Sequence, residues 1–266
     1  MVLFDQPWVD LVLITYGNAE MVERNLQDLL ENTDYPNYRL IVIDNQSLDD
    51  TWPRICDVLY QYENGFGLQC FVNMGYGQAC NLGSKLGNSP YIIFLNSDIH
   101  TTPEKRDWIT PLLEVFHDYK DVAVVAPKLI NDQGLLMGCG VVGTNKERRI
   151  RGWQEPDEGQ YDSLDEVLSV CGAVYAVRRD IFNEYGGFDG AYFHYNEEED
   201  FSFKVRNDGL RVVYQPASVL VHEHMGSCRD PGILNNYAQH GQSVFMNRWA
   251  GVMDDPATYP IPIKEV

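Results

Sequence analysis

The sequence is poor in positive charge. Its 266 residues include 20 lysines and arginines against 39 aspartates and glutamates, which gives a formal net charge of -19. Such a chain repels nucleic acids and anionic membrane surfaces, so neither is an expected partner. A phosphate ligand would need local compensation from a bound cation or from helix dipoles. The composition therefore favours a metal ion wherever the protein binds phosphate.

Long hydrophobic runs are also missing. No segment approaches the ~20 apolar residues that are needed to span a bilayer. The first residues, Met1 to Trp8, lack the basic start and the apolar stretch of a signal peptide. We therefore expect a soluble, cytoplasmic protein, whose oligomeric state the sequence does not indicate.

The cysteines form no recognisable motif. All six lack CxxC or zinc-like spacing, and a chain of this size does not need a disulfide scaffold. We predict reduced, mostly buried thiols. The sequence also contains neither a P-loop nor a GxGxxG fingerprint. What it does contain is 44% hydrophobic residues, enough at this length for a substantial core.

Short apolar runs alternate with helical patterns through the first half of the chain. Strands are predicted at 9–15, 39–44, 67–72, 91–95 and 122–126, and helices near 22–30, 51–62, 78–86 and 107–119. This alternation predicts an α/β fold with a mainly parallel sheet and helices on both faces. Residues 1–130 would form a Rossmann-like, ligand-binding half.

The pattern changes after residue 130. Residues 131–165 are rich in glycine and charge, and four basic residues gather at Lys146, Arg148, Arg149 and Arg151. This segment is either a solvated hairpin, or a lid or contact for an acceptor phosphate. Helices are predicted near 179–185, from 197 onward and over 234–249, and strands near 212–214 and 219–221. Residues 131–266 would be the second half of the same domain, with a smaller subregion beside the sheet and a C-terminal helical extension.

Polar side chains end several of the predicted strands: Thr15 and Tyr16, then Asp44, then Asn96, Ser97 and Asp98. In an open α/β sheet, ligands bind beyond the carboxyl ends of the strands. Asp44 is a candidate for accepting the imide hydrogen of a pyrimidine base, or it only builds a turn. Asp98 suits a hard divalent cation shared with substrate phosphates, unless it only precedes a helix.

A glycine-rich loop occupies residues 73–83. Its glycines permit close approach of a ligand, and the following helix can present free amides to a phosphate, although turn geometry alone would also explain them.

Glu197, Glu198, Glu199 and Asp200 begin a predicted helix. Acidic residues in a first turn stabilise a helix without any further role. However, the aromatic segment 188–195 precedes them, and a carboxylate beside apolar rings becomes more basic, as a general base requires. His222 ends a strand and is either a transition-metal ligand or a packed side chain.

The order of these motifs resembles the family 2 glycosyltransferases with a GT-A fold, especially the branch that includes bacterial rhamnosyltransferases. The resemblance covers nearly the whole chain. The motifs are Thr15-Tyr16, Asp44-Asn45-x-Ser47-x-Asp49, Asn73-x-Gly75-x-Gly77-x-x-x-Asn81-x-Gly83, Leu95-Asn96-Ser97-Asp98, Gly172-Ala173, Gly186-Gly187-Phe188-Asp189, Glu197-Glu198-x-Asp200, and His222 ahead of Gly226-Ser227.

The resemblance implies a role for each motif. Asp98 corresponds to the metal-binding last position of the DXD motif, with Asn96 in place of its first aspartate. Asp98, His222 and the donor diphosphate would hold Mn or Mg, and the imidazole favours Mn. Glu198 would be the catalytic base, with Glu197 as the alternative. The nucleotide-sugar would contact Thr15, Tyr16, Asp44, Asn73, Gly77, Asn81, Asn96 and Ser97, and the acceptor would face Gly172, Ala173 and Asp200. Lys204 and Arg206 lie near a family arginine to which a phosphate contact is attributed.

The implied reaction is a metal-dependent transfer, with inversion, of a sugar from a UDP or dTDP donor to an acceptor hydroxyl. The acceptor would be a saccharide or glycoconjugate. Two alternatives stay open. A nucleotidyltransferase acting on sugar phosphates would need a triphosphate loop, for which residues 15–18 are poorly suited. A non-catalytic nucleotide- or carbohydrate-binding protein of the same fold is compatible with Asn96 and Glu198, because both stand where the family usually has aspartate.

Overall fold

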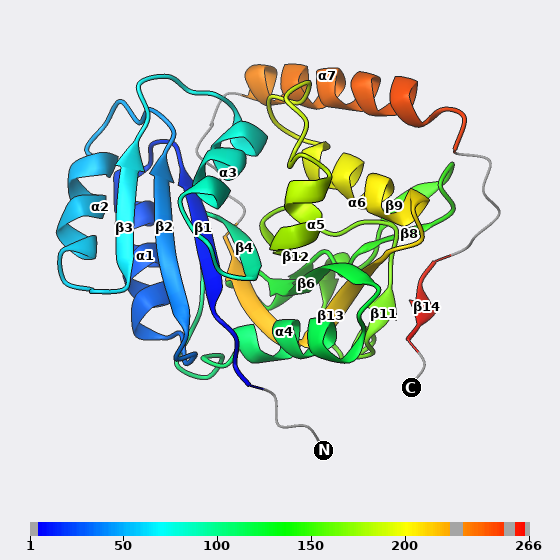
Figure 1. Ribbon diagram of the computed structural model, residues 1–266, viewed down its shortest axis with the longest axis horizontal. Coiled ribbons are helices and arrows are strands. Elements are labelled where there is room, and N and C mark those ends of the chain that lie inside the picture. The colour runs from blue at the N-terminus through cyan, green and yellow to red at the C-terminus, as the bar shows by residue number, and fades with distance from the viewer. Residues whose placement is uncertain (1–4, 224–230, 253–258, 264–266) are drawn as a thin grey trace.

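The computed structural model describes residues 5–223, 231–252 and 259–263 of the chain. Most strands belong to one large sheet, which helices cover (Figure 1). The strands are β1 (Val9–Thr15), β2 (Tyr38–Asp44), β3 (Gly65–Gln69), β4 (Tyr91–Asn96), β5 (Ile99–His100), β6 (Val122–Ile130), β7 (Leu135–Met137), β8 (Val141–Gly143), β9 (Arg148–Ile150), β10 (Trp153–Pro156), β11 (Asp165–Glu166), β12 (Val174–Arg178), β13 (Arg211–His222) and β14 (Ile261–Pro262). The helices are α1 (Ala19–Glu31), α2 (Thr51–Leu59), α3 (Tyr76–Lys85), α4 (Ile109–Asp118), α5 (Arg179–Glu184), α6 (Glu197–Asn207) and α7 (Pro231–Trp249).

Four parallel strands bring the polar strand ends together. Neighbours in the order β4-β1-β2-β3 are parallel, so their carboxyl ends lie along one edge of the sheet. Thr15 pairs with Asp44 and Ile14 with Asn96. All seven residues of β1 are buried, as expected for a central strand covered on both faces. The predicted mainly parallel sheet is therefore confirmed for this part of the molecule.

Strand β12 joins the two halves of the sheet. It lies between β4 and β6 and is antiparallel to both. The backbone N–H of Asn96 donates to the Ala173 carbonyl at 2.9 Å. On the other side of β6, strand β13 runs parallel to it, and its last residue, His222, pairs with Ile99 of β5. Residues from the second half of the chain thus reach the edge where β1, β2 and β4 end.

The helices cover both faces, because alternate residues of each strand point to opposite sides. Leu11 and Leu13 of β1 pack in a core that also contains apolar residues of α1, α2 and α4. Val12 and Ile14 pack in a second core with residues of α3, α5 and α6. The predicted α/β architecture with helices on both faces is confirmed.

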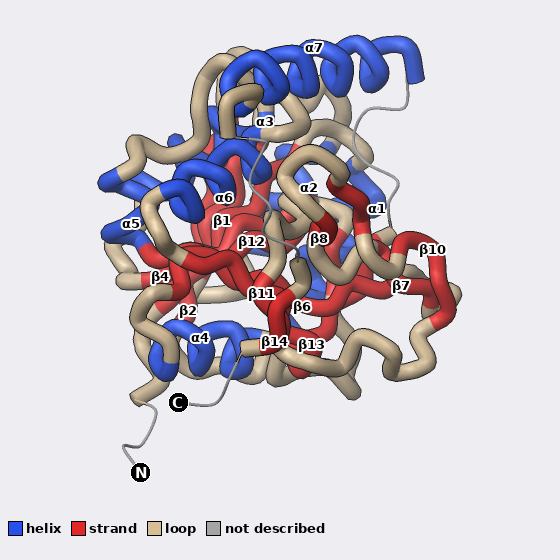
Figure 2. The backbone as a smooth tube through the Cα atoms, turned by 90° about the vertical axis from the view of Figure 1, so that its right-hand side faces the viewer, coloured by secondary structure: helices blue, strands red, loops and turns tan. Residues whose placement is uncertain are grey.

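Helix α7 lies outside these layers. It runs above α6 in Figure 1 and again forms the top of the molecule when the view is turned in Figure 2. Its residues Phe245 and Trp249 pack with Phe203 of α6 and Tyr192 in a small separate cluster. The predicted C-terminal helix is therefore present and is packed against α6.

Several local predictions differ from the structure. Residues 131–165, expected to form either a solvated hairpin or a lid, contain the short strands β7 to β10. The two strands expected at 212–214 and 219–221 form the single strand β13, with a register shift between Gln215 and Val219. Strand β12 was not predicted. Among the described cysteines, all of which are free, Cys70, Cys80 and Cys139 are buried, whereas Cys56 is exposed.

None of the described helices is long and apolar enough to cross a membrane.

Candidate active site

The carboxyl ends of β1, β2 and β4 open into a cavity of about 1690 Å³. This exceeds the roughly 300–1,000 Å³ of an ordinary small-molecule pocket, so it offers room for two substrates. One part of the lining comes from the strand ends and the loop before α3. The other part comes from the β7–β10 segment, the first turn of α6 and α7. Of the predicted site residues, the lining includes Thr15, Tyr16, Asn73, Asn96, Ser97, Asp98, Gly172, Ala173, Glu197, Glu198 and His222.

The loop before α3 is held firmly beside the end of β2. Asn45 donates from its side-chain amide to Oδ1 of Asn73 at 3.0 Å and accepts from the Met74 backbone N–H at 3.0 Å. Gly75 has a φ of 83°, and a Cβ atom there would collide with the Phe193 carbonyl. Only glycine allows this approach. Asn45, which lines the cavity, was quoted in a motif but not predicted as a site residue.

Asp44 does not line the cavity. Its buried carboxylate accepts hydrogen bonds from Thr15 Oγ1 at 3.2 Å, from Gln69 Nε2 at 3.0 Å, and from both the backbone and the hydroxyl of Ser47. Such a carboxylate has little capacity left for a nucleobase. The structure therefore favours the turn-building interpretation of Asp44, in which it fixes the ends of β1 and β2.

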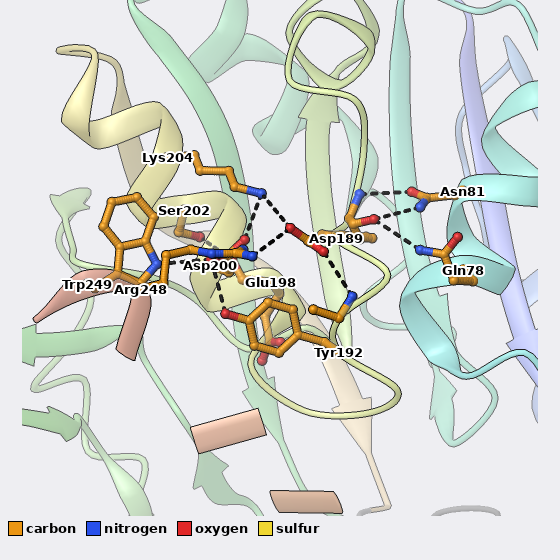
Figure 3. A network of polar contacts seen from close by, with 12 residues as sticks. Gln78, Asn81, Asp189, Tyr192, Glu198, Asp200, Ser202, Lys204, Arg248 and Trp249 are labelled. Atoms are coloured by element: carbon orange, nitrogen blue, oxygen red, sulfur yellow. Dashed lines mark hydrogen bonds and ion pairs between the residues drawn. The ribbon is translucent and has the colours of Figure 1, made fainter. Parts of the chain in front are cut away.

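Three other predicted ligand contacts, Gly77, Asn81 and Asp200, also lie outside the lining. Asn81 donates to the Phe188 carbonyl at 2.8 Å and accepts from the Phe188 N–H at 2.9 Å (Figure 3). A Cβ atom on Gly77 would lie 3.1 Å from that of Phe188. Both residues dock α3 onto the segment before α6. Their positions make them supports of a cavity wall.

Asp98 and His222 meet at the cavity. Oδ2 of Asp98 lies 3.4 Å from Nε2 of His222, and their side chains are only 5% and 7% exposed. The Asp98 carbonyl accepts from the Glu223 N–H at 3.0 Å, and Asn25 of α1 donates to the Ser97 carbonyl at 3.1 Å. The turn after β4 is thus held by both α1 and the end of β13.

This pair fits a partial metal site. In the described part of the chain, no cluster of three or more His, Cys, Asp or Glu side chains could hold a metal ion. An oxygen and a nitrogen 3.4 Å apart can share one ion at ligand distances of about 2.1 Å. Mg²⁺ and similar cations are often held by one or two protein groups plus substrate phosphates. The donor set therefore suits an ion that a nucleotide diphosphate helps to bind.

The first turn of α6 sends consecutive acidic side chains in different directions, since a helix turns about 100° per residue. Glu197 is 2% exposed, and its Oε2 has no hydrogen-bond partner among the described residues. Glu198 lies against Gly172, where an added Cβ atom would be 3.2 Å from its Cδ. Glu199 pairs with Arg148 of β9 at 2.8 Å. The predicted acidic cluster thus separates into side chains with distinct surroundings.

Burial controls the protonation of the first two acids. It raises the pKa of Glu198 to about 7. Burial, and then the charge of Glu198, raise the pKa of Glu197 well above its usual 4.5. Both effects favour the protonated form of Glu197. Glu198 ionises near neutrality, which suits a general base that takes a proton from a hydroxyl.

His194 adds a neutral imidazole to the lining. Burial lowers its pKa to about 4, although the charge of Asp98 acts in the opposite direction. Its ring meets that of Tyr76 edge-on, with centroids 6.2 Å apart. An uncharged imidazole can exchange hydrogen bonds with a ligand but does not neutralise a phosphate. In the sequence analysis His194 was only part of the aromatic segment 188–195 and was not predicted as a site residue.

The basic segment contains two arginines that pair with acids, Arg148 and Arg151, and two exposed residues, Lys146 and Arg149. Arg148 pairs with Glu199 and lies over the rings of Phe203 and Phe245. Arg151 is buried and pairs with Asp165 at 2.7 Å. These two arginines hold the hairpin in place, so the solvated interpretation is wrong for them. Arg149 is exposed and lines the cavity, which keeps the phosphate-contact interpretation open for that residue.

Lys204 and Arg206 do not line the cavity. Lys204 pairs with Asp200 at 2.8 Å, and Arg206 lies over the ring of Tyr259. Their contacts hold α6 and nearby chain segments. Residues 224–227, which the sequence motif included, lie outside the described residues.

Comparison with known proteins identifies the family. Residues 10–186 match the model "Glycosyl transferase family 2", so the chain belongs to the family 2 glycosyltransferases. The expected family and enzyme class are confirmed. This membership favours sugar transfer over the nucleotidyltransferase alternative.

Similar curated proteins include bacterial rhamnosyltransferases. The N-acetylglucosaminyl-diphospho-decaprenol L-rhamnosyltransferase of Mycobacterium tuberculosis is 28% identical over 261 residues, which span 89% of this chain and 82% of that protein. Rhamnosyltransferase WbbL of Escherichia coli is 25% identical over 236 residues, spanning 80% of this chain and 83% of WbbL. The O-antigen biosynthesis protein RfbC of Myxococcus xanthus is 23% identical over 96% of this chain, but the match spans only 20% of RfbC.

Solved structures confirm the GT-A fold. The mannosyltransferase PcManGT from Pyrobaculum calidifontis, in complex with GDP-Man and Mn²⁺, matches with a TM-score of 0.66 and 15% identity over 95% of this chain and 66% of that one. GalNAc-T7 with UDP, GalNAc and Mn²⁺ also matches with a TM-score of 0.66 and 15% identity, over 82% of this chain and 44% of that one. At this identity the likeness concerns the fold alone.

Proposed function

We propose that this glycosyltransferase moves a sugar from a nucleoside diphosphate, UDP or dTDP, to an acceptor hydroxyl with inversion at the anomeric carbon. The observation that carries the proposal is that Asp98, His222 and Glu198 line one cavity at the carboxyl ends of the central strands. Such a transfer requires a pair of side chains that bind a cation and a general base of suitable pKa.

The donor would occupy the part of the cavity formed by the first half of the chain. Thr15, Tyr16 and Asn73 would contact the nucleoside, and Asn96 and Ser97 the ribose. Asn45 fixes the loop that carries Asn73, through the 3.0 Å bond to its side chain. Asp44 supports this region indirectly because it accepts from Thr15 and Ser47. The loop geometry therefore orients the donor before any chemistry occurs.

Asp98 and His222 would hold the divalent metal together with the donor diphosphate. When bound, Mn²⁺ or Mg²⁺ stabilises negative charge on the departing diphosphate. Glu198 would accept the proton of the acceptor hydroxyl, and its pKa of about 7 matches that task at neutral pH. Burial and the charge of Glu198 raise the pKa of the neighbouring Glu197, which disfavours a second negative charge beside the base. Gly172 leaves room for the Glu198 side chain, since an added Cβ atom there would lie 3.2 Å from Cδ of Glu198.

The acceptor half of the cavity suits a saccharide attached through phosphate to an apolar carrier. Ile150 and Trp153 on one side, and Ile233 and Met246 of α7 on the other, are exposed apolar side chains that line the cavity. Arg149 lies beside them as an exposed cation in a chain of net charge -19. This combination favours an acceptor phosphate with an apolar group attached. The name of the mycobacterial relative describes such a lipid diphosphate.

The first experiment screens nucleotide-sugars for thermal stabilisation of the protein, with and without Mn²⁺, because a bound donor stabilises the fold by mass action. Release of the nucleoside diphosphate is then measured with a saccharide acceptor and with the same saccharide on a lipid diphosphate. Faster turnover with the lipid form, lost in Arg149→Ala but kept in Lys146→Ala, is expected. Equal rates with both forms would contradict the assignment of the carrier.

The alternatives have their own measurements. Pyrophosphate release from a sugar phosphate and a nucleoside triphosphate would contradict sugar transfer. Donor binding without either transfer or donor hydrolysis, across the screened acceptors, would identify a non-catalytic binding protein.

A further inference from the structure

Helix α7 packs directly on the segment that leads into the catalytic turn of α6. A Cβ atom on Gly241 would lie 2.6 Å from the Tyr195 carbonyl, so the helix backbone is in contact with that residue. Tyr195 and Asn196 both have positive φ angles, 72° and 70°, immediately before Glu197. The ring of Tyr237 packs on that of Phe193, with centroids 4.8 Å apart. The chain enters α6 through an uncommon backbone conformation that α7 covers.

The C-terminal end of α7 is fastened to the same turn through Asp200 (Figure 3). Oδ1 of Asp200 accepts from Arg248 Nη1 at 2.8 Å and from Trp249 Nε1 at 3.0 Å. It also accepts from the Tyr192 hydroxyl at 3.1 Å, and Lys204 Nζ lies 2.8 Å from Oδ2. Asp200 is fully buried. A buried carboxylate requires such partners, so these hydrogen bonds fix the position of the end of α7 relative to Asp200.

Asp200 lies two residues after Glu198 on one rigid helical turn. That turn has no side-chain cap at Asn196. Its orientation is instead held by α7 at Asp200 and by Arg148 at Glu199, and Arg148 itself lies 4.5 Å from the ring centroid of Phe245 on α7. Movement at the end of α7 would therefore be transmitted to the Glu198 carboxylate.

We propose that Arg248 and Trp249, acting through Asp200, are positioning residues that hold the Glu198 carboxylate where the acceptor hydroxyl arrives. The proposal rests on the function proposed above, in which Glu198 is the base. Because Tyr237, Gln242 and Met246 of the same helix line the acceptor side of the cavity, one element both borders the acceptor and places the base. The helical extension is thus part of the catalytic apparatus, although it does not carry the base.

The decisive variant is Trp249→Phe, which keeps an aromatic ring but removes the N–H donor to Asp200 together with part of the indole that packs on Phe203 and Phe245. We expect its kcat for transfer to fall about 10- to 100-fold, since a misplacement of 1 Å can cost two orders of magnitude. The dissociation constant of the donor should change by less than about twofold, because the donor half of the cavity is unchanged. Arg248→Lys keeps the charge but loses the fork of donors, so an intermediate loss is expected.

The pH profile separates positioning from general destabilisation. Loosening the turn admits water to Glu198, so the pH midpoint of kcat should move below about 7. Other titratable groups that interact with Glu198 are unchanged in these variants; they are Glu197 and Glu199 on α6, Cys171 and Tyr175 at β12, and Tyr76 and Cys80 on α3. A loss of folded protein would lower the rate at every pH without moving the midpoint.

Arg211→Ala is the matched control. It removes an arginine that pairs with Asp121 at the other end of β13 and does not line the cavity. Its midpoint should equal that of the unmodified protein. An unchanged midpoint in both Trp249→Phe and Arg248→Lys, whatever their rates, would overturn the positioning role. If Trp249→Phe folds poorly, Arg248→Lys decides alone.

Glu198→Gln is measured in parallel. Normal turnover in Glu198→Gln would remove the base assignment and this inference together. An inactive Glu198→Gln, combined with unmoved midpoints in Trp249→Phe and Arg248→Lys, would remove only the inference.

Discussion

Oδ2 of Asp98 and Nε2 of His222 lie 3.4 Å apart at the end of the central strands, and within the described ranges no cluster of three metal-binding side chains includes them. Two protein ligands bind a divalent ion weakly unless the substrate completes its coordination. We therefore expect Mn²⁺ to bind the free protein weakly and to bind much more tightly once UDP or dTDP is present. Calorimetric titration of Mn²⁺, with and without nucleotide, measures the difference.

The same pair gives a mutational test. His222→Ala should lower the affinity for Mn²⁺ in the presence of nucleotide by more than about tenfold, since even outer-shell partners of a metal ligand are worth 10–100-fold. Asp98→Ala should abolish metal-dependent transfer. His117→Ala, on a surface of α4 away from the cavity, is the control. Tight binding by the free protein that His222→Ala leaves undiminished would remove His222 from the site.

Glu198→Gln keeps the size of the side chain and removes its ability to take a proton. Turnover should fall about 10²- to 10⁴-fold, the usual contribution of a general base. Donor affinity, measured by thermal stabilisation with the nucleotide-sugar, should be retained. Glu199→Gln is measured beside it, because Glu199 pairs with Arg148 and is not the proposed base. Near-normal turnover in Glu198→Gln would transfer the base role to Glu197.

The rate should rise with pH through neutrality. Burial raises the pKa of Glu198 to about 7, and the base acts only in its ionised form. Below that value the protonated fraction grows, so kcat/KM should fall about tenfold for each pH unit. The measurement is initial rate against pH at fixed metal and donor. A profile that stays flat from pH 5 to 8 would show that no group of raised pKa controls the reaction.

Glu197→Gln should stabilise the protein at alkaline pH. Because burial raises the pKa of Glu197 in the folded state above its unfolded value, its contribution to stability is fully present below about 4.5 and is lost as pH rises. A neutral glutamine removes that loss. We expect a higher Tm at pH 8 and little change at pH 4.

Asp121→Asn should change the Tm at pH 8 in the opposite direction to Glu197→Gln. The hydrogen bond from Arg211 holds the pKa of Asp121 below its usual value, so its contribution is present at neutral pH and lost on acidification. This variant should have a slightly lower Tm at pH 8. If both variants shifted in the same direction at pH 8, the pH dependence would not arise from these carboxyl groups.

Asn81→Ala distinguishes support from ligand contact. Its amide bonds both the N–H and the carbonyl of Phe188, so truncation should cost about 1–3 kcal/mol of stability. Donor affinity should be nearly unchanged. Asn73→Ala, at a residue that lines the cavity, should show the reverse pattern of weaker donor binding. Chemical denaturation and donor titration of the two variants measure both quantities. Loss of donor affinity in Asn81→Ala with unchanged stability would restore the ligand-binding interpretation.

The sequence predicted those features that depend on local pattern. Apolar runs ending in polar residues located β1, β2 and β4, and the common direction of parallel strands then brought Thr15, Asn96 and Asp98 to one edge. Strand β12 was missed although Val174–Arg178 is a short apolar run, because the surrounding motifs gave no signal of an antiparallel partner for β4.

Other features depended on tertiary neighbours that the pattern does not contain. Asp44 has the residue type of a ligand contact, yet Thr15, Ser47 and Gln69 already occupy its carboxylate. The role of α7 was equally hidden, since Arg248 reaches Asp200 across 48 positions of the chain. Sequence reasoning therefore located the cavity more reliably than it separated its lining from its supports.

The antiparallel strand β12 limits how acceptor specificity can be transferred between such enzymes by making chimaeras. It supplies the backbone partners of both β4 and β6, so a chimaera joined at residue 130 must match the foreign β12 to two native strands at once. Strands β9 and β10 and helix α7 contribute no strand to the centre of the sheet, yet residues of each line the acceptor side. New acceptors are therefore most readily accommodated by grafting these peripheral elements, while the central strands stay intact.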